Sequence, residues 1–121
     1  MAKVKAVAVA GCEPEFMGMG PVPATRKALA RAGLSMAEID VVEINEAFGS
    51  QAVACLRELG IGRRRVNIDG GAIALGHPPG ATGARITAKA AQILEREGGR
   101  YALAAQCIGG GQGIATILEA V

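Results

Sequence analysis

The chain has 121 residues, which is enough for one ordinary domain and too few for two. Half of the residues are hydrophobic and 20% are charged, which favours a packed core over disorder. A net charge of +2 and an aromatic content of 2% argue against nucleic-acid binding through basic patches or stacking surfaces.

The first part of the chain predicts a strand followed by a helix. Residues 4–10 alternate with a period of two, and the run is too short and too rich in alanine for a signal peptide or membrane anchor. A helix is expected over 24–32, with Gly33 at its C-terminal cap. Ser35 and Glu38 have the spacing of a capping box and predict one short turn.

The middle of the chain predicts a second strand and a second helix. Residues 39–44 contain the β-branched residues of a short buried strand. Residues 46–59 carry an apolar stripe at helical spacing, and Gly60 follows as a cap. The arginines from Arg63 to Arg65 could grip a phosphate, but such a run of charge is more typical of a solvated loop.

The last part of the chain predicts a long helix and a hairpin. A brief strand is expected over 66–69, and a helix over 82–97. Two apolar runs, 100–107 and 113–120, are joined by 108–112 and indicate an antiparallel pair. The alternation of strands and helices along the chain predicts an α/β layered domain with a mixed sheet.

The three cysteines are Cys12, Cys55 and Cys107. Their number is odd and their spacing fits neither a zinc site nor a redox pair. The simplest interpretation is a reduced, cytoplasmic protein without a metal.

Glycine is the surplus residue of this sequence, and nine of its 18 glycines lie in the segments 70–83 and 109–113. The first segment surrounds His77, the only histidine, and the second follows Cys107. Each feature alone has a simpler interpretation, as a turn histidine, a small core cysteine or a hairpin turn. Together they suggest an acid/base pair, with glycine N–H groups close enough to a ligand to stabilise an oxyanion.

Asn45 stands between the second predicted strand and the second predicted helix. One interpretation is an N-cap, since asparagine is among the best residues at that position. The other is an amide aimed into a site at the C-terminal end of the strand, where ligands of α/β folds tend to bind.

Several segments together resemble the C-terminal signature blocks of the thiolases, which are acetyl-CoA acetyltransferases and 3-ketoacyl-CoA thiolases. They are 45–48 (NEAF), 70–78 (GGAIALGHP) and 107–111 (CIGGG), supported by 17–24 (MGMGPVPA). Their order and separations also fit. The resemblance implies that residues 1–121 are a thiolase C-terminal domain, a layered α/β half-domain whose mixed sheet has helices on both faces.

The resemblance also implies a role for each matching residue. His77 would activate the nucleophilic cysteine of the family and help to bind the thioester oxygen. Cys107 would remove or return the α-proton of the second acyl-CoA. Asn45 would hold a catalytic water and form one oxyanion hole with His77, and the N–H of Gly109 would donate to the other.

Ala47 and Phe48 would line the tunnel for the pantetheine arm, and no cofactor beyond the CoA thioester substrates is implied. The sequence departs from the family at a few positions. Pro79 stands where leucine is usual, Thr82 where serine is frequent, and Gly49 where alanine is common. Pro79 could shift the start of the helix and therefore the ring of His77.

The resemblance covers only the second of the two similar halves of a thiolase. The nucleophilic cysteine belongs to the first half, and neither Cys12 nor Cys55 fits that role. Cys12 lies in a stretch unlike the nucleophile motif, and Cys55 lies on an apolar helix stripe. The leading hypothesis is therefore an acyltransferase domain of fatty acid metabolism, inactive without its N-terminal half and part of a homo-oligomer, with no nucleic-acid or membrane partner.

Two alternatives stay open. The chain could be a non-catalytic module that pairs with itself, or with an N-terminal half, through a large apolar patch. It could also be another condensing enzyme of the same fold, such as a ketoacyl synthase, although those enzymes usually carry a second histidine in place of Cys107. The sequence indicates neither the acyl chain nor the direction of the reaction.

Overall fold

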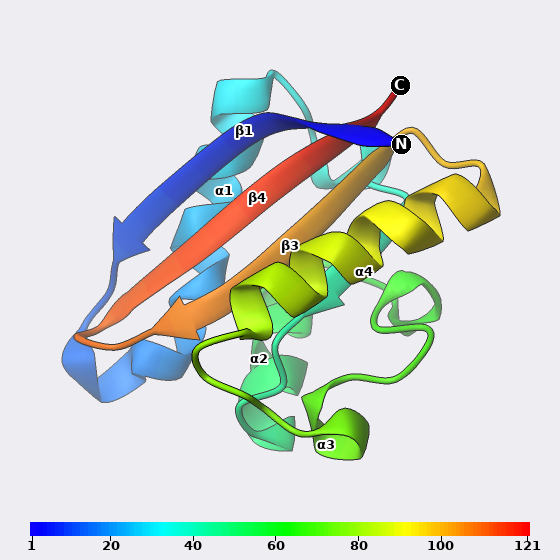
Figure 1. The fold of residues 1–121 in the computed structure, drawn as a ribbon. Coiled ribbons are helices and arrows are strands. Elements are labelled where there is room, and N and C mark those ends of the chain that lie inside the picture. The colour runs from blue at the N-terminus through cyan, green and yellow to red at the C-terminus, as the bar shows by residue number, and fades with distance from the viewer.

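A computed structural model describes residues 1–121 and has one four-stranded sheet with helices on both faces (Figure 1). The strands are β1 (Ala2–Gly11), β2 (Val41–Ile44), β3 (Tyr101–Ile108) and β4 (Gln112–Ala120), and their order in the sheet is β1-β4-β3-β2. Strand β4 is antiparallel to β1 and β3, whereas β2 is parallel to β3. The mixed α/β architecture predicted from the sequence is confirmed.

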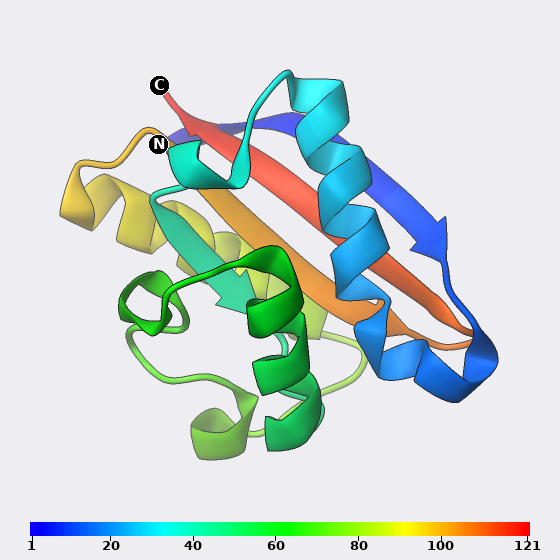
Figure 2. The ribbon, with the colours of Figure 1, turned by 180° about the vertical axis from the view of Figure 1, so that it is seen from behind.

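Four helices connect and cover these strands. They are α1 (Pro21–Ala32), α2 (Gly49–Leu59), α3 (Ala72–Leu75) and α4 (Thr82–Glu97). Helix α4 lies on the face of the sheet that is in front in Figure 1, and α1 and α2 lie behind it, as the reverse view shows (Figure 2). Short 3-10 segments occur at η1 (Pro14–Met19), η2 (Met36–Glu38) and η3 (Arg63–Arg65). No helix has the length and apolar character that crossing a membrane requires.

The core has one apolar layer on each face of the sheet. On the α1 face, Ala8, Ala115 and Ala105 lie side by side across three strands, and all are buried. These small residues let α1 pack closely on the sheet. On the other face, Ile93 and Leu94 of α4 are fully buried, which stabilises the fold by about 1.5–3 kcal/mol for each side chain.

Helix α4 covers only part of its face of the sheet. The side chains of Val7 and Val9 on β1 are each 40% exposed. In the sheet register they lie beside Thr116 and Ile114 of β4, which are partly buried. We call these four residues the open face; it adjoins a groove of about 200 Å³ between α4 and β4.

The two chain ends meet at one corner of the molecule (Figure 1). Ala2 pairs with Ala120 in the sheet, and the Val121 N–H donates to the Met1 carbonyl at 3.2 Å.

Several predicted elements are confirmed closely. Helix α4 has the predicted bounds, and β3 and β4 form the predicted antiparallel hairpin. The capping box is present, with the backbone N–H of Ser35 donating to Glu38 Oε2 at 2.8 Å. Gly33 ends α1 in the left-handed conformation, as expected, but that helix begins three residues before the predicted start, at Pro21.

Two predictions for the middle of the chain are wrong. No strand forms over 66–69: Val66 makes only an isolated bridge to Val42, and Asn67 then turns the chain with a φ of 45°. The second helix begins at Gly49 rather than at residue 46, because Phe48 is extended and the Glu46 carboxylate bonds elsewhere.

Candidate active site

The residues singled out from the sequence gather at one end of the sheet. Strands β2 and β3 are parallel, so their C-terminal ends meet at the same edge, and the N–H of Asn45 donates to the Ala105 carbonyl at 2.9 Å. Cys107 comes two residues after Ala105. Helix α4 starts at this edge too, since Gly83 and Gln106 line the same groove.

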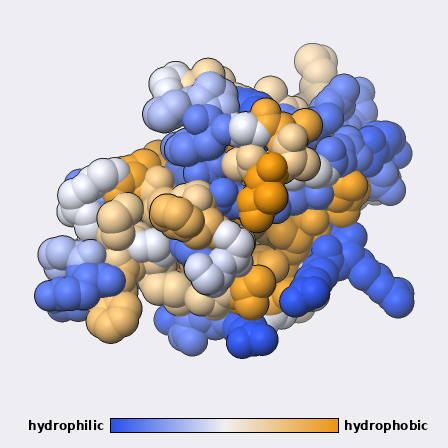
Figure 3. All heavy atoms as spheres, turned by 90° about the horizontal axis from the view of Figure 1, so that it is seen from below, coloured by the Kyte–Doolittle hydropathy of each residue, from blue (hydrophilic) through white to orange (hydrophobic).

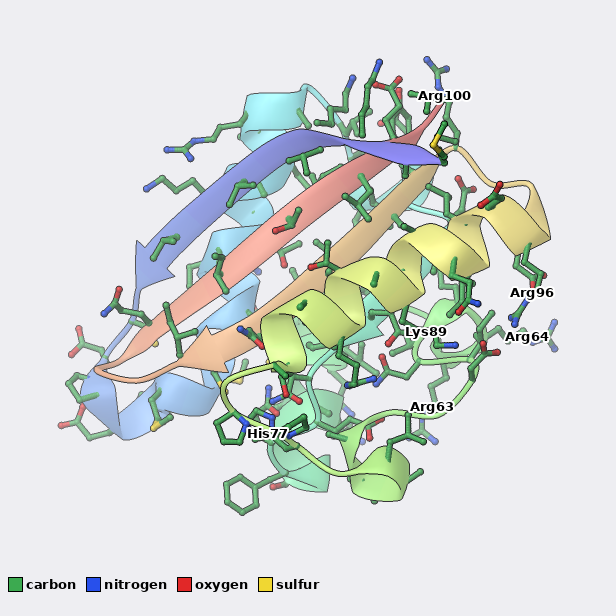
Figure 4. The ribbon with its side chains drawn as sticks, viewed as in Figure 1. Arg63, Arg64, His77, Lys89, Arg96 and Arg100 are labelled. Carbon is green, nitrogen blue, oxygen red and sulfur yellow. The ribbon has the colours of Figure 1, made fainter.

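His77 is held by the first residue of α4. Its Nδ1 lies 2.7 Å from the Thr82 hydroxyl, and that hydroxyl donates its proton to the Pro78 carbonyl at 2.9 Å. We assign the single hydroxyl proton to the Pro78 carbonyl, so that Nδ1 donates to the hydroxyl oxygen and Nε2 keeps a free lone pair. The ring is exposed, and Figure 4 shows it just below the start of α4. His77 is therefore set to accept a proton at Nε2.

Asn45 is only 1% exposed, yet its side-chain Oδ1 has no hydrogen-bond partner in the protein. The N-cap interpretation is wrong, because α2 begins at Gly49 and Phe48 occupies the cap position. A buried amide without a partner costs stability, and it suits a ligand or a bound water. Strand alternation places Asn45 on the α4 face with Val41 and Glu43, and His77 is bonded to the first residue of that helix.

A network around Glu46 fixes the end of β2. One carboxylate oxygen of Glu46 accepts from the Asn67 side chain at 2.8 Å, and the other accepts from the Ile73 N–H at 3.0 Å. The Asn67 side chain also bonds both the N–H and the carbonyl of Ile44 at 2.9 Å. A side chain at Gly71 would collide with the Glu46 carboxylate. The network ties the strand that carries Asn45 to the loop that leads to His77.

Asn67 was not singled out from the sequence. Its contacts lie more than 20 residues away, and only the resemblance of the Glu46 block could have hinted at them.

Cys107 is half-buried at the end of β3, on the α1 face of the sheet by alternation from Leu103 and Ala105. It therefore lies across the strand ends from Asn45. Burial raises the pKa of the Cys107 thiol, and the nearby Cys12 raises it further by a smaller effect. The thiol is thus held in its protonated form.

Cys55 is confirmed as a core residue. It is fully buried, its thiol lies 3.4 Å from the Gly18 carbonyl, and burial raises its pKa.

The turn after Cys107 contains backbone N–H groups, that of Gly109 among them, without a backbone partner. Gly110 and Gly111 have φ values of 79° and 70°, a conformation that L side chains rarely adopt. The N–H of Gly109 donates to no backbone carbonyl in this turn, and the space around Gly109 is open. Gly113 packs so closely on Gly20 that a side chain would collide with its backbone. The geometry holds the Gly109 N–H available to an incoming oxyanion.

Large apolar side chains near the strand ends are exposed. Phe48 is 74% exposed and Ile73 of α3 is 69% exposed, whereas Ala47 is partly buried. Hydrophobic atoms form patches between hydrophilic ones at this end of the molecule (Figure 3). A cavity of about 250 Å³ opens between α2 and α3, bordered by Glu46, Ile73 and Arg63 among others. This surface is apolar enough to receive a ligand or another protein surface.

The arginine run is mainly a solvated surface. Arg63 and Arg64 are exposed (Figure 4), and Arg65 donates to the Ile39 carbonyl. The run forms a 3-10 turn rather than an irregular loop. No group of three His, Cys, Asp or Glu side chains is placed to hold a metal ion.

Comparison with known proteins points to one family. A family model described as the C-terminal domain of thiolase matches residues 1–120. A 3-ketoacyl-CoA thiolase of Vibrio cholerae is 55% identical over 98% of this chain and 31% of its own length. A 3-oxoadipyl-CoA/3-oxo-5,6-dehydrosuberyl-CoA thiolase of Escherichia coli is 58% identical over 99% of this chain and 30% of its own. The chain thus spans about a third of the length of these relatives.

Solved structures agree. The human mitochondrial 3-ketoacyl-CoA thiolase superposes with a TM-score of 0.97 and 51% identity, covering 99% of this chain and 30% of that one. The acetyl-CoA acetyltransferase of Bacillus anthracis superposes with a TM-score of 0.97 and 44% identity, covering 100% of this chain and 31% of that one.

Proposed function

Because the chain belongs to the thiolase family as its C-terminal domain, we propose that it supplies half of an active site that transfers acyl groups between CoA thioesters. The reaction is thiolysis of a 3-ketoacyl-CoA or the reverse Claisen condensation. The observation that carries the proposal is the hydrogen bond from His77 Nδ1 to Thr82, which leaves Nε2 free as a base at the end of the sheet.

His77 and Asn45 form one part of the proposed machinery. His77 takes the proton of the attacking thiol at Nε2. With a water held by the buried Asn45 amide, the ring also supports the thioester oxygen as it gains negative charge.

Cys107 and Gly109 form the other part. In thiolysis the bond between the α- and β-carbons of the ketoacyl group breaks, and the departing acetyl-CoA enolate takes a proton from the Cys107 thiol. The raised pKa of that thiol keeps the proton ready for this step. In condensation the proton moves the other way, from the α-carbon to the thiolate. The Gly109 N–H stabilises the enolate or thioester oxygen in both directions.

The nucleophile comes from the N-terminal half that thiolase relatives carry and this chain does not span. The open face of β1 and β4, where Val7 and Val9 are exposed, gives that half an apolar surface for docking. Phe48 and Ala47 then line the channel for the pantetheine arm. One similar structure is a human mitochondrial 3-ketoacyl-CoA thiolase in complex with CoA.

We also propose a wider setting for this reaction. The substrates are acyl-CoA thioesters of fatty acid metabolism, no cofactor besides CoA takes part, the assembled enzyme is a homo-oligomer, and it works in the cytoplasm.

The test is thiolysis of acetoacetyl-CoA by the chain alone and by the chain mixed with the N-terminal half of the Vibrio cholerae relative. We expect no turnover by the chain alone, because acyl transfer needs the nucleophile. We expect turnover by the mixture, lost with His77→Ala. Turnover by the chain alone that His77→Ala abolishes would overturn the need for a second half, and an assembled mixture without turnover would overturn the catalytic proposal.

A second candidate function is a non-catalytic pairing module, and the open face is the observation that favours it. Light scattering separates the two: self-association through this face would be weakened by Val7→Lys. A monomer at high concentration would count against self-pairing. The ketoacyl synthase alternative is set aside, because the comparisons identify thiolases.

A further inference from the structure

Glu43 and Arg85 place two charged groups inside the layer between β2 and α4. Glu43 lies on β2 and is 0% exposed, and neither of its carboxylate oxygens has a hydrogen-bond partner in the protein. Arg85 lies in the first turns of α4, and all three of its guanidinium nitrogens are likewise buried and without a partner. Five buried polar atoms in this state are costly, so the pair calls for a physical explanation.

Glu43 and Arg85 are close enough for their charges to interact, but they form no direct hydrogen bond or salt bridge. Arg85 is the cation with the largest favourable effect on the ionised Glu43, ahead of Lys89, while Asp69 and Glu46 act with smaller, opposite effects. Lys89 is engaged elsewhere, since its ammonium bonds Asp69 at 3.2 Å. Arg85 is therefore the main counter-charge of Glu43. Water between them would satisfy both groups.

The position of the pair relates it to the proposed catalytic groups. Asn45 is two residues beyond Glu43 on the same strand face. Thr82, which holds His77, is three residues before Arg85 and on the same side of the helix. The distance between Glu43 on the strand and Arg85 on the helix therefore also sets the distance between Asn45 and His77.

We propose that Glu43 and Arg85 form a water-bridged charge pair that positions the first turn of α4 against the end of β2, and so aligns His77 with Asn45. This inference rests on the proposed roles of His77 and Asn45. Both residues act through others and are positioning residues. Since burial makes the ionised carboxylate costly, the pair exists at the expense of fold stability.

Two properties distinguish positioning from simple structural support. If the pair only supported the fold, changing one partner would lower the free energy of unfolding. For a positioning pair, we expect Glu43→Gln to raise the free energy of unfolding at pH 8. A positioning pair should also affect the tautomer of His77. His77 is the only histidine, so the nitrogen NMR signals of labelled histidine report it without assignment.

The experiment uses the 121-residue chain at pH 8, above the ordinary titration range of histidine. The wild type should show mainly the Nδ1–H tautomer. Glu43→Gln and Arg85→Met should each shift the signals toward those of the two-tautomer mixture that free imidazole shows. The double variant should shift them no further. Arg85→Lys keeps the charge and should retain more of the wild-type signal than Arg85→Met.

The matched control is the exposed pair Arg26 and Glu58, whose side chains are 2.6 Å apart on the surface. Arg26→Met and Glu58→Gln should leave the His77 signals unchanged. Unchanged His77 signals in Glu43→Gln, or effects of the two single variants that add in the double variant, would overturn the proposal. If Arg85→Met does not fold, Glu43→Gln and Arg85→Lys decide the question. These readouts need no turnover, so they are independent of whether the thiolase proposal holds.

Discussion

The buried carboxyl of Glu43 makes a prediction for the pH dependence of stability. Burial raises the pKa of Glu43 from its ordinary 4.5 to about 7, against the opposing effect of Arg85. The folded chain therefore holds this proton more tightly than the unfolded chain. The resulting stability is fully present below pH 4.5, and it is lost as the pH rises toward 7.

The size of the effect follows from the same shift. At 1.36 kcal/mol for each pH unit, ionisation of Glu43 costs about 3 kcal/mol at pH 8. Glutamine has the shape of the protonated carboxyl and does not ionise. Glu43→Gln should therefore match the wild type in acid and exceed its free energy of unfolding by about 3 kcal/mol at pH 8.

Urea unfolding followed by circular dichroism at pH 5, 6, 7 and 8 measures this difference. Other carboxyls titrate in both proteins and cancel in the comparison. Glu58→Gln, at an exposed position, is the control and should show no such trend. The reasoning would be refuted if the difference in free energy of unfolding between wild type and Glu43→Gln stayed constant with pH. It would also be refuted if the variant became the less stable protein as the pH rises.

Other predictions concern the network and the turn. Thr82→Val should remove the partner of His77 and lower kcat of the assembled enzyme about 10-fold or more while KM changes little, as measured by acetoacetyl-CoA thiolysis; an unchanged kcat would contradict the assigned tautomer. Asn67→Ala should cost about 2–4 kcal/mol in urea unfolding, because buried backbone groups lose their partner. Gly113→Ala should prevent cooperative folding by colliding with the backbone of Gly20, visible as loss of a thermal transition. Cys55 should be the last thiol to react with iodoacetamide, by mass spectrometry of digests, and early labelling would contradict its burial.

The elements that depend on local patterns could be predicted well. Helix α4 has an apolar stripe followed by glycine, and its bounds were those expected. The start of α2 could not be predicted, because Glu46 suits a first helical turn but is held by Asn67, which is distant in sequence. The absent strand over 66–69 has the same origin, since the turn at Asn67 serves that contact.

In the candidate site, too, local patterns could be predicted and contacts between distant residues could not. His77, Cys107 and Asn45 could be selected from motif and composition, but the choice between N-cap and buried amide for Asn45 needed the true start of α2. Glu43 sits among apolar strand residues, and only the packing of α4 on β2 shows that Arg85 faces it. Such long-range pairs leave no periodic signal in a single sequence.

The meeting of the two chain ends has a consequence for how this domain can be joined to others. Because Met1 and Val121 are hydrogen-bonded at one corner, a second domain could be attached at either end and would leave the sheet from nearly the same point. A circular permutant that places the N-terminal thiolase half after Val121, with a short flexible linker, should therefore present it to the same open face. In this architecture the order of the halves along the chain and their arrangement in space are separable properties.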